Sequence, residues 1–516
     1  PILALALALA LTLTACGSAG TASSAAASAS SAKSNTLVYG SNDYTRINPA
    51  LDEHGEINAL LFDGLTGHDK DNQVVPRLAE SWELDKATNT YTFHLRQDVT
   101  WHDGEKFTAE DVKFTIEAIQ DPKNESENAS NYEDVEKITV VDDHTVKFQL
   151  AEPNYAFLDY MTMAILPKHL LEGKDLQTDD YFRHPIGTGP YKLASWEAGQ
   201  AITLVRNEDY FRGKANIQTI IFRIVPDSNA KALQLKSGEL NLSQVTPKDA
   251  KTFADAKGQT VYEMKTSDYR GILYNFANDY WKKNADLIPA FNYAIDRQAM
   301  IDAVLLGAGE VAYGPLQRNI YNCEDVEHYD YDPNKAMKTL EAAGCTKEKD
   351  GFYYRDGQKV GFVLSVGSGD QVRLDMAQIA AQQLKAVGVD VTVDVPAQVD
   401  WGGQEAYLIG WGSPFDADDH TYKVFGTGKG SNYSSYSDKL VDQYLTEARQ
   451  TDDTQKRKEA YAKFQKELAK NPAYTFFCYI DAFYVADNSL KGITPDTVLG
   501  HHGVGIFWNV LDWTLE

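Results

Sequence analysis

Between residues 91 and 95 apolar and polar side chains alternate strictly, in the order Tyr-Thr-Phe-His-Leu. A period of two predicts a half-buried strand. Residues 103–104, Asp-Gly, are expected to turn the chain, because glycine adopts a positive φ without a Cβ clash. From Thr108 the period becomes helical, with Thr108 as the N-cap and Asp111 completing a capping box. The pattern therefore predicts a strand, a turn and a helix that form one rigid unit over residues 91–119.

A second pattern predicts a βαβ unit near residues 360–395. Valine-rich strands are expected at 360–366 and 389–395, with a helix from about 370 to 387 between them. Such crossovers join parallel strands, and ligands of open α/β sheets bind beyond the carboxyl ends of those strands. The loop 367–370 lies at that end, and Arg373 follows one turn into the helix. Arg373 is therefore a candidate anchor for an anionic ligand group, and an ordinary exposed arginine is the alternative.

The remaining periodic segments complete an α/β reading of the chain. The residue at 238, a glycine, is expected to end one helix, and the apolar tail at 500–513 is expected to pack back on the first domain. Strands are predicted at 36–40, 137–141, 145–150, 201–206 and 219–225, and helices at 57–65, 76–82, 155–168 and 229–237, with a charged, solvated helical region at 442–469 interrupted near 450–453.

Composition and motifs narrow the classes of protein. The 516 residues are 43% hydrophobic and 11% aromatic, which suffices for sizeable cores in two or three domains. The formal net charge of −25 argues against nucleic acid or anionic lipid as a partner, and a soluble acidic surface accounts for it. The sequence has no zincin, nucleophile-elbow or P-loop motif. We therefore expect neither an enzyme nor a chain that powers transport by itself.

The N-terminal residues have the features of an export signal. Residues 2–13 form an Ala/Leu run that is too short to span a bilayer and is typical of a signal peptide. The sequence Leu-Thr-Ala-Cys-Gly at 13–17 resembles a lipobox, so residues 1–16 are predicted to be a lipoprotein signal peptide that ends at Cys16, the lipidated residue. An ordinary signal cleavage with an incidental cysteine is the alternative. The Ser/Ala-rich residues 17–34 are expected to act as a tether outside the membrane.

Several motifs along the chain resemble one known family. The pattern F-x-L-R…V-x-W-H-D-G-x-x-F-T-A-x-D-V at 93–112 resembles the signature of the family 5 solute-binding proteins of ABC importers, the peptide/nickel/opine group. Further resemblances follow in the family's order at 185–191 (PIGTGPY), 294–297 (AIDR), 410–412 (GWG) and 432–434 (NYS). Together they cover residues 35–516.

The resemblance implies an α/β fold, a two-lobe clamp like that of the type II periplasmic binding proteins, with an extra inserted subdomain. Lobe I would comprise 35–50, 186–270 and 485–516, the inserted subdomain 51–185, and lobe II 271–484. The protein would be a monomer without a cofactor, lipid-anchored to the cell membrane on its outer side. It would capture a small ligand between its lobes and deliver it to an ABC permease, whose ATPase subunits do the work.

Two histidine-bearing loops suggest a nickel chelate as the transported ligand. His501 and His502 lie in a glycine-flanked loop, and His54 lies in the loop before the first predicted helix. Both loops resemble the variable loops that supply histidine ligands in nickel-binding members of the family, and neutral imidazole suits nickel. Arg373 would then bind the carboxylates of the chelator, as arginines of this family bind ligand carboxylates. Two unrelated surface loops are the alternative.

A di- or oligopeptide is the second candidate ligand. In peptide-binding relatives an aspartate after the Gly-Trp motif binds the ligand's α-amino group, and here Trp411 is followed by Asp416, Asp418 and Asp419. The spacing departs from the common form, so which of the three has this role stays open, and a solvated acidic turn is the alternative. An extracellular metal hydrolase is the remaining class, although no motif supports it. Whether Cys323 and Cys345 form a disulfide is also open.

Overall fold

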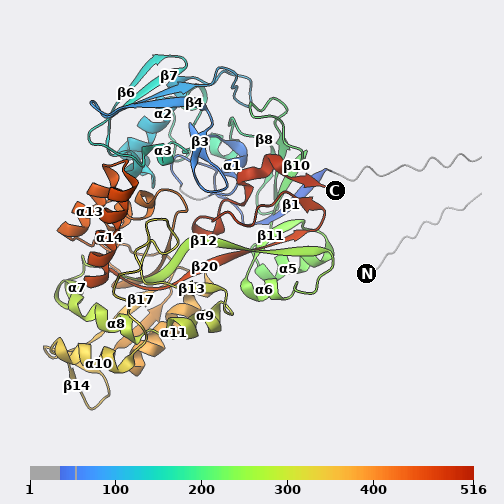
Figure 1. The fold of residues 1–516 in the computed structure, drawn as a ribbon. Helices are drawn as coiled ribbons and strands as arrows, with labels where there is room; N and C mark the ends of the chain where they lie inside the picture. Colours follow the sequence, from blue (N-terminus) through green and yellow to red (C-terminus); the bar gives the residue numbers. More distant parts are fainter. Residues whose placement is uncertain (1–34, 53–54) are drawn as a thin grey trace, which may run out of the picture. The chain divides into compact units, whose positions relative to one another are not determined.

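An 11-stranded mixed sheet is the central feature of the computed structural model, which describes residues 35–52 and 55–516 (Figure 1). The strand order is β18-β17-β19-β12-β20-β11-β1-β10-β9-β8, and β13 pairs with β20 off this path. The strands are β1 (Thr36–Ser41), β8 (Tyr191–Glu197), β9 (Ala201–Arg206), β10 (Thr219–Ile224), β11 (Leu242–Val245), β12 (Gln259–Tyr274), β13 (Gly309–Val311), β17 (Gly361–Ser365), β18 (Asp390–Asp394), β19 (Ala406–Trp411) and β20 (Tyr474–Asp487).

Two long neighbouring strands, β12 and β20, run through the middle of this sheet (Figure 1). Their antiparallel ladder extends from the pair Gln259↔Asp487 to the pair Leu273↔Tyr474. Near the first pair β20 also pairs with β11, and near the last pair β12 also pairs with β19. The same two strands therefore join the two parts of the sheet, which are β19, β17 and β18 on the side of β12 and β11, β1, β10, β9 and β8 on the side of β20.

A separate four-stranded antiparallel sheet holds the stretch with the strictest alternation. Its order is β4-β5-β7-β6, with β4 (Ala79–Asp85), β5 (Thr90–Leu95), β6 (Val135–Asp142) and β7 (Thr145–Leu150). Gly104 makes the predicted turn with φ +99, and α2 (Ala109–Gln120) follows with the capping box of Thr108 and Asp111. Ile116 and Ile119 of α2 are fully buried. The prediction of one strand–turn–helix unit is confirmed.

The other elements are short helices and strand pairs around these sheets. The helices are α1 (Asn58–Leu61), α3 (Phe157–Tyr160), α4 (Lys168–Leu171), α5 (Ser228–Ser237), α6 (Pro247–Lys251), α7 (Asp279–Asn284), α8 (Ile288–Ala294), α9 (Arg297–Val304), α10 (Pro333–Ala342), α11 (Gln371–Ala386), α12 (Tyr422–Phe425), α13 (Lys439–Arg449) and α14 (Thr454–Lys470). The small strands are β2 (Thr66–His68), β3 (Val74–Pro76), β14 (Thr346–Lys347), β15 (Tyr353–Arg355), β16 (Gln358–Lys359), β21 (Leu490–Lys491) and β22 (Thr514–Leu515).

The predicted βαβ unit is confirmed. Strands β17 and β18 are parallel, and α11 crosses between them. Asp370 is the N-cap of this helix, because its side chain accepts a hydrogen bond from the backbone N–H of Arg373 at 2.9 Å. Gly238, with φ +78, ends α5 as expected. The predicted strands at 36–40, 137–141, 145–150, 201–206 and 219–225 are present as β1, β6, β7, β9 and β10.

Three predicted helices were wrong in kind or length. Pro76 ends β3 and residues 79–82 begin β4, because β4 pairs with β5 from Ala79 to Asp85 and tertiary pairing overrides helix propensity. The helix expected at 155–168 is only α3, and Pro167 begins α4 instead of ending a helix, since proline lacks the N–H that a helix start does not need. The helix expected at 57–65 is reduced to α1.

The C-terminal segments pack inward. Phe507, Val510 and Trp513 are buried in the same core as Leu37 and Tyr39 of β1, which confirms the predicted return of the tail. The predicted helical pair at 442–469 is present as α13 and α14, but it is not simply solvated. One face of the pair is buried, through Val441, Leu445, Ala448, Tyr461, Phe464 and Leu468.

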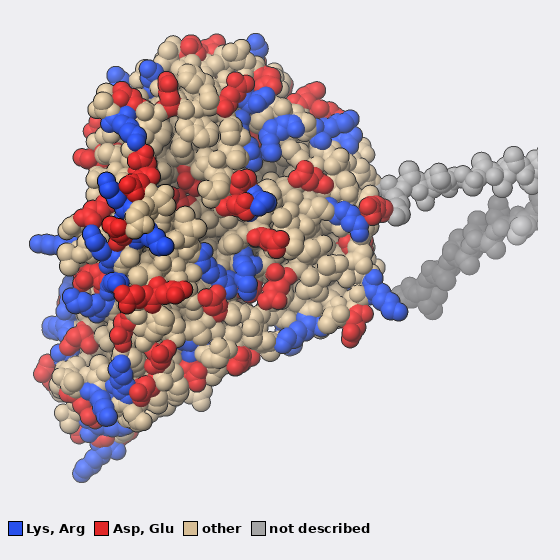
Figure 2. Space-filling model, in the orientation of Figure 1, with Lys and Arg blue, Asp and Glu red and all other residues tan. Residues whose placement is uncertain are grey.

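The described part of the chain also settles two smaller questions. Cys323, Cys345 and Cys478 are free thiols, so the open pair Cys323–Cys345 is not a disulfide in this structure. Within residues 35–52 and 55–516, no helix combines the length and the apolar character of a membrane span. Acidic and basic side chains are interspersed over the face shown in Figure 2, as expected for a solvated acidic surface.

Candidate functional site

A bulge in β12 places two charged residues at the centre of the sheet. The pairing register of β12 with β20 shifts between Lys265 and Tyr269. At the same point the chain that leads to the histidine loop joins β12, because Ser267 N–H donates to the Leu499 carbonyl at 3.0 Å and Leu499 N–H donates to the Lys265 carbonyl at 2.9 Å. The histidine loop therefore starts from the bulge that holds Asp268.

Asp268 contacts both histidines of this loop. Its Oδ1 lies 2.8 Å from His501 Nδ1, and its Oδ2 accepts a hydrogen bond from the backbone N–H of His502 at 2.9 Å. His502 has φ 57, a left-handed conformation that turns the chain sharply, and the two imidazole centroids are 3.9 Å apart. The turn thus holds two imidazoles side by side.

The far end of the histidine turn is fixed by Glu56, in the loop before α1, and by Tyr484, in β20. Gly505 N–H donates to Glu56 Oε1 at 3.1 Å. The hydroxyl of Tyr484, in β20, lies 2.9 Å from the Gly503 carbonyl and 3.1 Å from Glu56 Oε1. Burial raises the pKa of Glu56 to about 7.

Two arginines lie close together beside Asp268, the buried Arg270 and the partly buried Arg373, whose Nε is 3.2 Å from Asp370 Oδ2. Arg270 forms an ion pair with Asp268, and the side chains of this pair are almost fully buried. A Cβ atom at Gly410 would collide with both Arg270 and Arg373, so both guanidinium groups reach the bare Cα of this glycine. Burial, and then Arg270, lower the pKa of Arg373. The site therefore presents two closely spaced cations.

The charges of this cluster keep one imidazole neutral. Burial opposes the charged form of Asp268, but Arg270 and then His501 hold its pKa well below the ordinary value. Burial, followed by the field of His501, lowers the pKa of His502 to about 2. A neutral imidazole is the form that binds a transition metal.

Trp411, at the end of β19, closes the cluster on one side. Its ring is nearly parallel to that of His501, at an angle of 28° and a centroid distance of 6.1 Å. The next residue, Gly412, has no room for a side chain, because a Cβ there would collide with the backbone of Ser267 and Asp268. The structure thus brings together four predicted site residues: Arg373, Trp411, His501 and His502. The other predicted ligand, His54, lies outside the described residues, as does Cys16.

The acidic turn after Trp411 is engaged by the protein's own cations. Asp418 is 1% exposed and forms an ion pair with Arg449 at 2.9 Å, and it accepts a hydrogen bond from the hydroxyl of Tyr160 at 2.5 Å. Asp416 forms an ion pair with Arg457 at 2.6 Å.

The third acid, Asp419, is likewise paired, with Lys423 at 3.0 Å. All three predicted amine ligands of this turn therefore serve as counter-ions within the chain.

A cavity of about 410 Å³ adjoins the histidine turn. Leu499, Gly500, Val504 and Gly505 supply one part of its wall, and Phe415 and Asp419 supply another.

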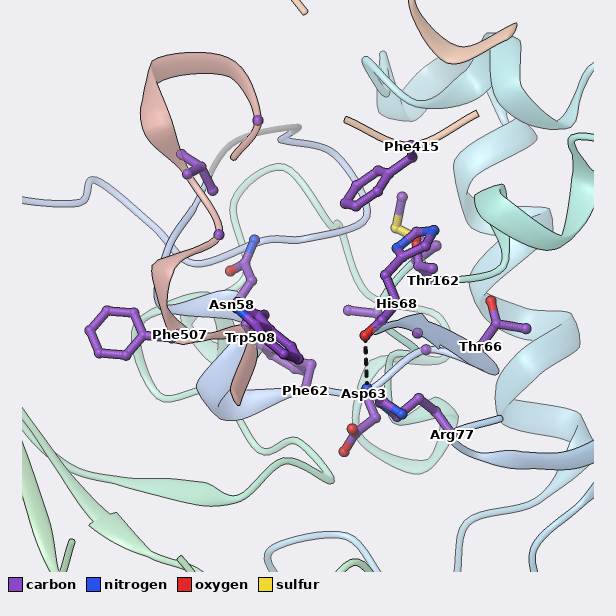
Figure 3. Close-up of a pocket in the computed structure, with 18 of the residues that line it drawn as sticks. Asn58, Phe62, Asp63, Thr66, His68, Arg77, Thr162, Phe415, Phe507 and Trp508 are labelled. Atoms are coloured by element: carbon purple, nitrogen blue, oxygen red, sulfur yellow. Dashed lines mark hydrogen bonds between the residues drawn. The ribbon is translucent and has the colours of Figure 1, made fainter. Parts of the chain in front are cut away.

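Figure 3 shows the ring of Phe415 over His68, with a centroid distance of 3.8 Å and an interplanar angle of 7°. His68 Nε2 lies 2.9 Å from Asp159 Oδ1, and its carbonyl accepts a hydrogen bond from Arg77 at 3.2 Å. Residues of β2, of the segment after β19 and of the C-terminal tail therefore line one space.

Protein side chains alone do not complete a metal centre here. No group of three or more His, Cys, Asp or Glu side chains in the described residues is arranged to hold a metal ion. His501 and His502 offer two imidazoles, and the partly buried Arg373 offers a guanidinium group for a carboxylate, whereas Arg270 is taken up by Asp268. The arrangement can therefore bind a metal that arrives with its own anionic ligands.

Asp268 and Arg270 were missed by the sequence analysis. The available signal was their spacing, since two charged residues two positions apart interrupt a strand that is otherwise apolar from Tyr269 to Tyr274. Residues i and i+2 of a strand share a face, and opposite charges there form a buried pair.

Comparison with known proteins gives a consistent picture. Residues 73–433 match the family model described as bacterial extracellular solute-binding proteins, family 5 Middle. The chain is 33% identical to Protein XP55 of Streptomyces lividans, over 90% of this chain and 86% of that protein. It is 30% identical to the oligopeptide-binding protein AppA of Bacillus subtilis, over 90% of this chain and 88% of that protein.

Two solved structures are similar over nearly the whole chain. NikZ from Campylobacter jejuni in complex with Ni(L-His) superposes with a TM-score of 0.86 at 36% identity, covering 93% of this chain and 99% of that one. AppA from Bacillus subtilis in complex with a nonapeptide superposes with a TM-score of 0.83 at 28% identity, with the same coverage.

Proposed function

The chain belongs to the family 5 bacterial extracellular solute-binding proteins of ABC importers, and from this premise we propose that its ligand is a nickel chelate. The observation that carries the proposal is the turn of His501 and His502, held by Asp268 beside Arg270 and Arg373. Relatives in this family are named as peptide-, glutathione- or nickel-chelate-binding proteins.

The proposal gives complementary tasks to the two kinds of side chain. The imidazoles of His501 and His502 would bind the metal, and Arg373 would bind carboxylates of a small chelator such as free histidine. The similarity to NikZ, whose solved complex holds Ni(L-His), supports this ligand class. Nickel is cargo in this reading, and the protein itself needs no cofactor.

A di- or oligopeptide is the second candidate, supported by the similarity to AppA. Its α-amino group would need a carboxylate that is not already neutralised. Asp416, Asp418 and Asp419 are each paired with a cation of the protein, so this requirement counts against the peptide. Arg373 is likewise paired, with Asp370 at 3.2 Å, so the nickel chelate is preferred for the two adjacent imidazoles of His501 and His502.

We also propose that ligand capture closes two lobes, with lobe I at 35–50, 186–270 and 485–516, the inserted subdomain at 51–185, and lobe II at 271–484. A ligand on His501 and Arg373 would touch both lobes and favour the closed state, because it binds that state better. Exclusion of water strengthens the charged contacts. The closed monomer would then deliver the ligand to the permease.

Calorimetry on the purified wild-type protein tests the proposed ligand. We expect nickel mixed with free histidine to bind with 1:1 stoichiometry, because the two imidazoles complete a coordination shell that the chelator begins. Nickel-free histidine and a panel of di- and oligopeptides serve as controls. Binding of peptides without binding of nickel and histidine would establish the peptide reading instead.

The membrane anchor is a further prediction. Cys16, which lies outside the described residues, would carry a diacylglyceryl group, since more than one acyl chain is needed for stable anchoring. Cys16→Ala should release the protein from the membrane fraction or leave its signal peptide uncleaved, as judged by fractionation and intact mass. A variant that stays in the membrane with the wild-type mass would contradict the lipobox.

A further inference from the structure

We propose that Asp268 is a positioning residue that fixes the ring of His501 in the tautomer with its proton on Nδ1 and its lone pair on Nε2. The inference rests on the proposed function, in which His501 is a metal ligand. It names a residue of β12 that decides which nitrogen of the His501 imidazole meets the metal.

The two oxygens of Asp268 have different tasks. Oδ1 lies 2.8 Å from the ring nitrogen Nδ1 of His501, whereas Oδ2 accepts the backbone N–H of His502 at 2.9 Å. One carboxylate therefore orients a side chain and also fixes the backbone of the next residue. The two contacts together set both the rotation of the His501 ring and its position relative to His502.

The direction of the ring hydrogen bond follows from the charge of Asp268. Arg270 is always protonated and forms a buried ion pair with this carboxylate, whose side chain is 0% exposed. An ionised carboxylate only accepts hydrogen bonds, so Nδ1 of His501 must donate. In a neutral imidazole the other nitrogen, Nε2, then carries the lone pair that a metal requires.

An alanine at this position would remove the assignment. Three N–H groups face Asp268, because Arg270 Nη1 and His501 Nδ1 both point at Oδ1 and the backbone N–H of His502 points at Oδ2. Alanine offers no acceptor, so nothing then holds the proton of the ring on Nδ1. Asparagine is the milder change, because its amide oxygen can still accept from Arg270 and His501 while its NH₂ group faces the N–H of His502 and no longer holds the turn.

The first test needs no nickel. Nitrogen-15 NMR of histidine side chains in the ligand-free wild-type protein, with His501 assigned by substitution, reports which ring nitrogen is protonated. We expect the Nδ1–H tautomer in the wild type and the loss of this preference in Asp268→Ala, where Nδ1 has no carboxylate to which it can donate. A wild-type ring protonated on Nε2, or an unchanged tautomer in the variant, would overturn the inference.

The second test measures binding of nickel with free histidine by calorimetry. Asp268→Ala should weaken binding about 10- to 100-fold, the usual effect of losing such a supporting residue. Asp481→Ala is the matched control, because Asp481 is a buried carboxylate of β20 that pairs with Arg318 at 2.7 Å. The control should bind as the wild type does. An equal loss in both variants would mean that any buried charge of the two central strands affects binding, and would contradict a specific role of Asp268.

The two tests separate this inference from the proposed function. A wild type that binds no nickel with histidine contradicts the proposed ligand, but its tautomer still decides the role of Asp268. If Asp268→Ala does not fold, the wild-type spectrum alone decides, since the Nδ1–H form is expected there and the Nε2–H form excludes the inference.

Discussion

Replacement of both His501 and His502 by alanine is expected to weaken the binding of nickel with free histidine by at least about 100-fold, or about 2.7 kcal/mol. The reason is that the double variant lacks both imidazoles of the turn, and a chelator alone then has to satisfy the metal. The turn itself should persist, because Asp268 still accepts the backbone N–H of residue 502 and Glu56 still accepts that of Gly505.

Calorimetry on the folded variant measures this effect. The melting temperature of the ligand-free double variant should fall by only a few degrees, because the hydrogen bond between His501 and Asp268 is lost while the ion pair of Asp268 with Arg270 remains. His184→Ala is the control, since His184 is 71% exposed and pairs only with Asp180 on the surface. Wild-type affinity in the double variant would show that these histidines are not ligands.

Arg449→Met is expected to lower the free energy of unfolding by about 3–5 kcal/mol. Arg449 is 4% exposed and joins Asp418 at 2.9 Å to Asp134, directly before β6, at 2.8 Å. Its carbonyl also accepts a hydrogen bond from the backbone N–H of Tyr155 at 3.0 Å. Removal of the guanidinium leaves two carboxylates close together without their counter-ion, which is the costly case for a buried ion pair.

An exposed ion pair provides the matched control. It joins the turn between β4 and β5 to the segment after α13. Lys86 and Asp452 form an ion pair at 2.5 Å with side chains that are 61% and 56% exposed. Lys86→Met should therefore change the free energy of unfolding by about 0–1 kcal/mol. Denaturant unfolding of both variants makes the comparison. Equal stability of the two variants would contradict the role given to the buried network.

Local patterns predicted the elements whose own residues determine their structure. The unit at 91–119 and the βαβ unit at 360–395 each contain their alternation, cap and turn within a few residues. The helix predicted at 76–82 was wrong because β4 is a strand only while β5 lies beside it. A helical period cannot reveal a partner strand that the rest of the fold supplies.

The residues of the candidate site divide in the same way into those that the sequence alone reveals and those that only the fold reveals. His501, His502 and Trp411 were recognisable from residue type and resemblance, and the fold places them together. Asp268 and Arg270 were not recognised, because their importance depends on a bulge that forms only when β12 pairs with β20. The acids at 416–419 had the right chemistry for an amine, but their pairing with Arg457, Arg449 and Lys423 depends on tertiary packing.

The place of β20 in the sheet has a consequence for the order of synthesis. This strand lies between β12 and β11, yet it begins only at Tyr474 of a 516-residue chain. A nascent chain that ends before it has no partner for most of β12, and the core beside β1 still lacks Phe507 and Trp513. Contacts of such long sequence separation form slowly. Completion of the sheet must therefore wait until residues 474–487 have been synthesised, although β1, β11 and β12 precede them in the chain.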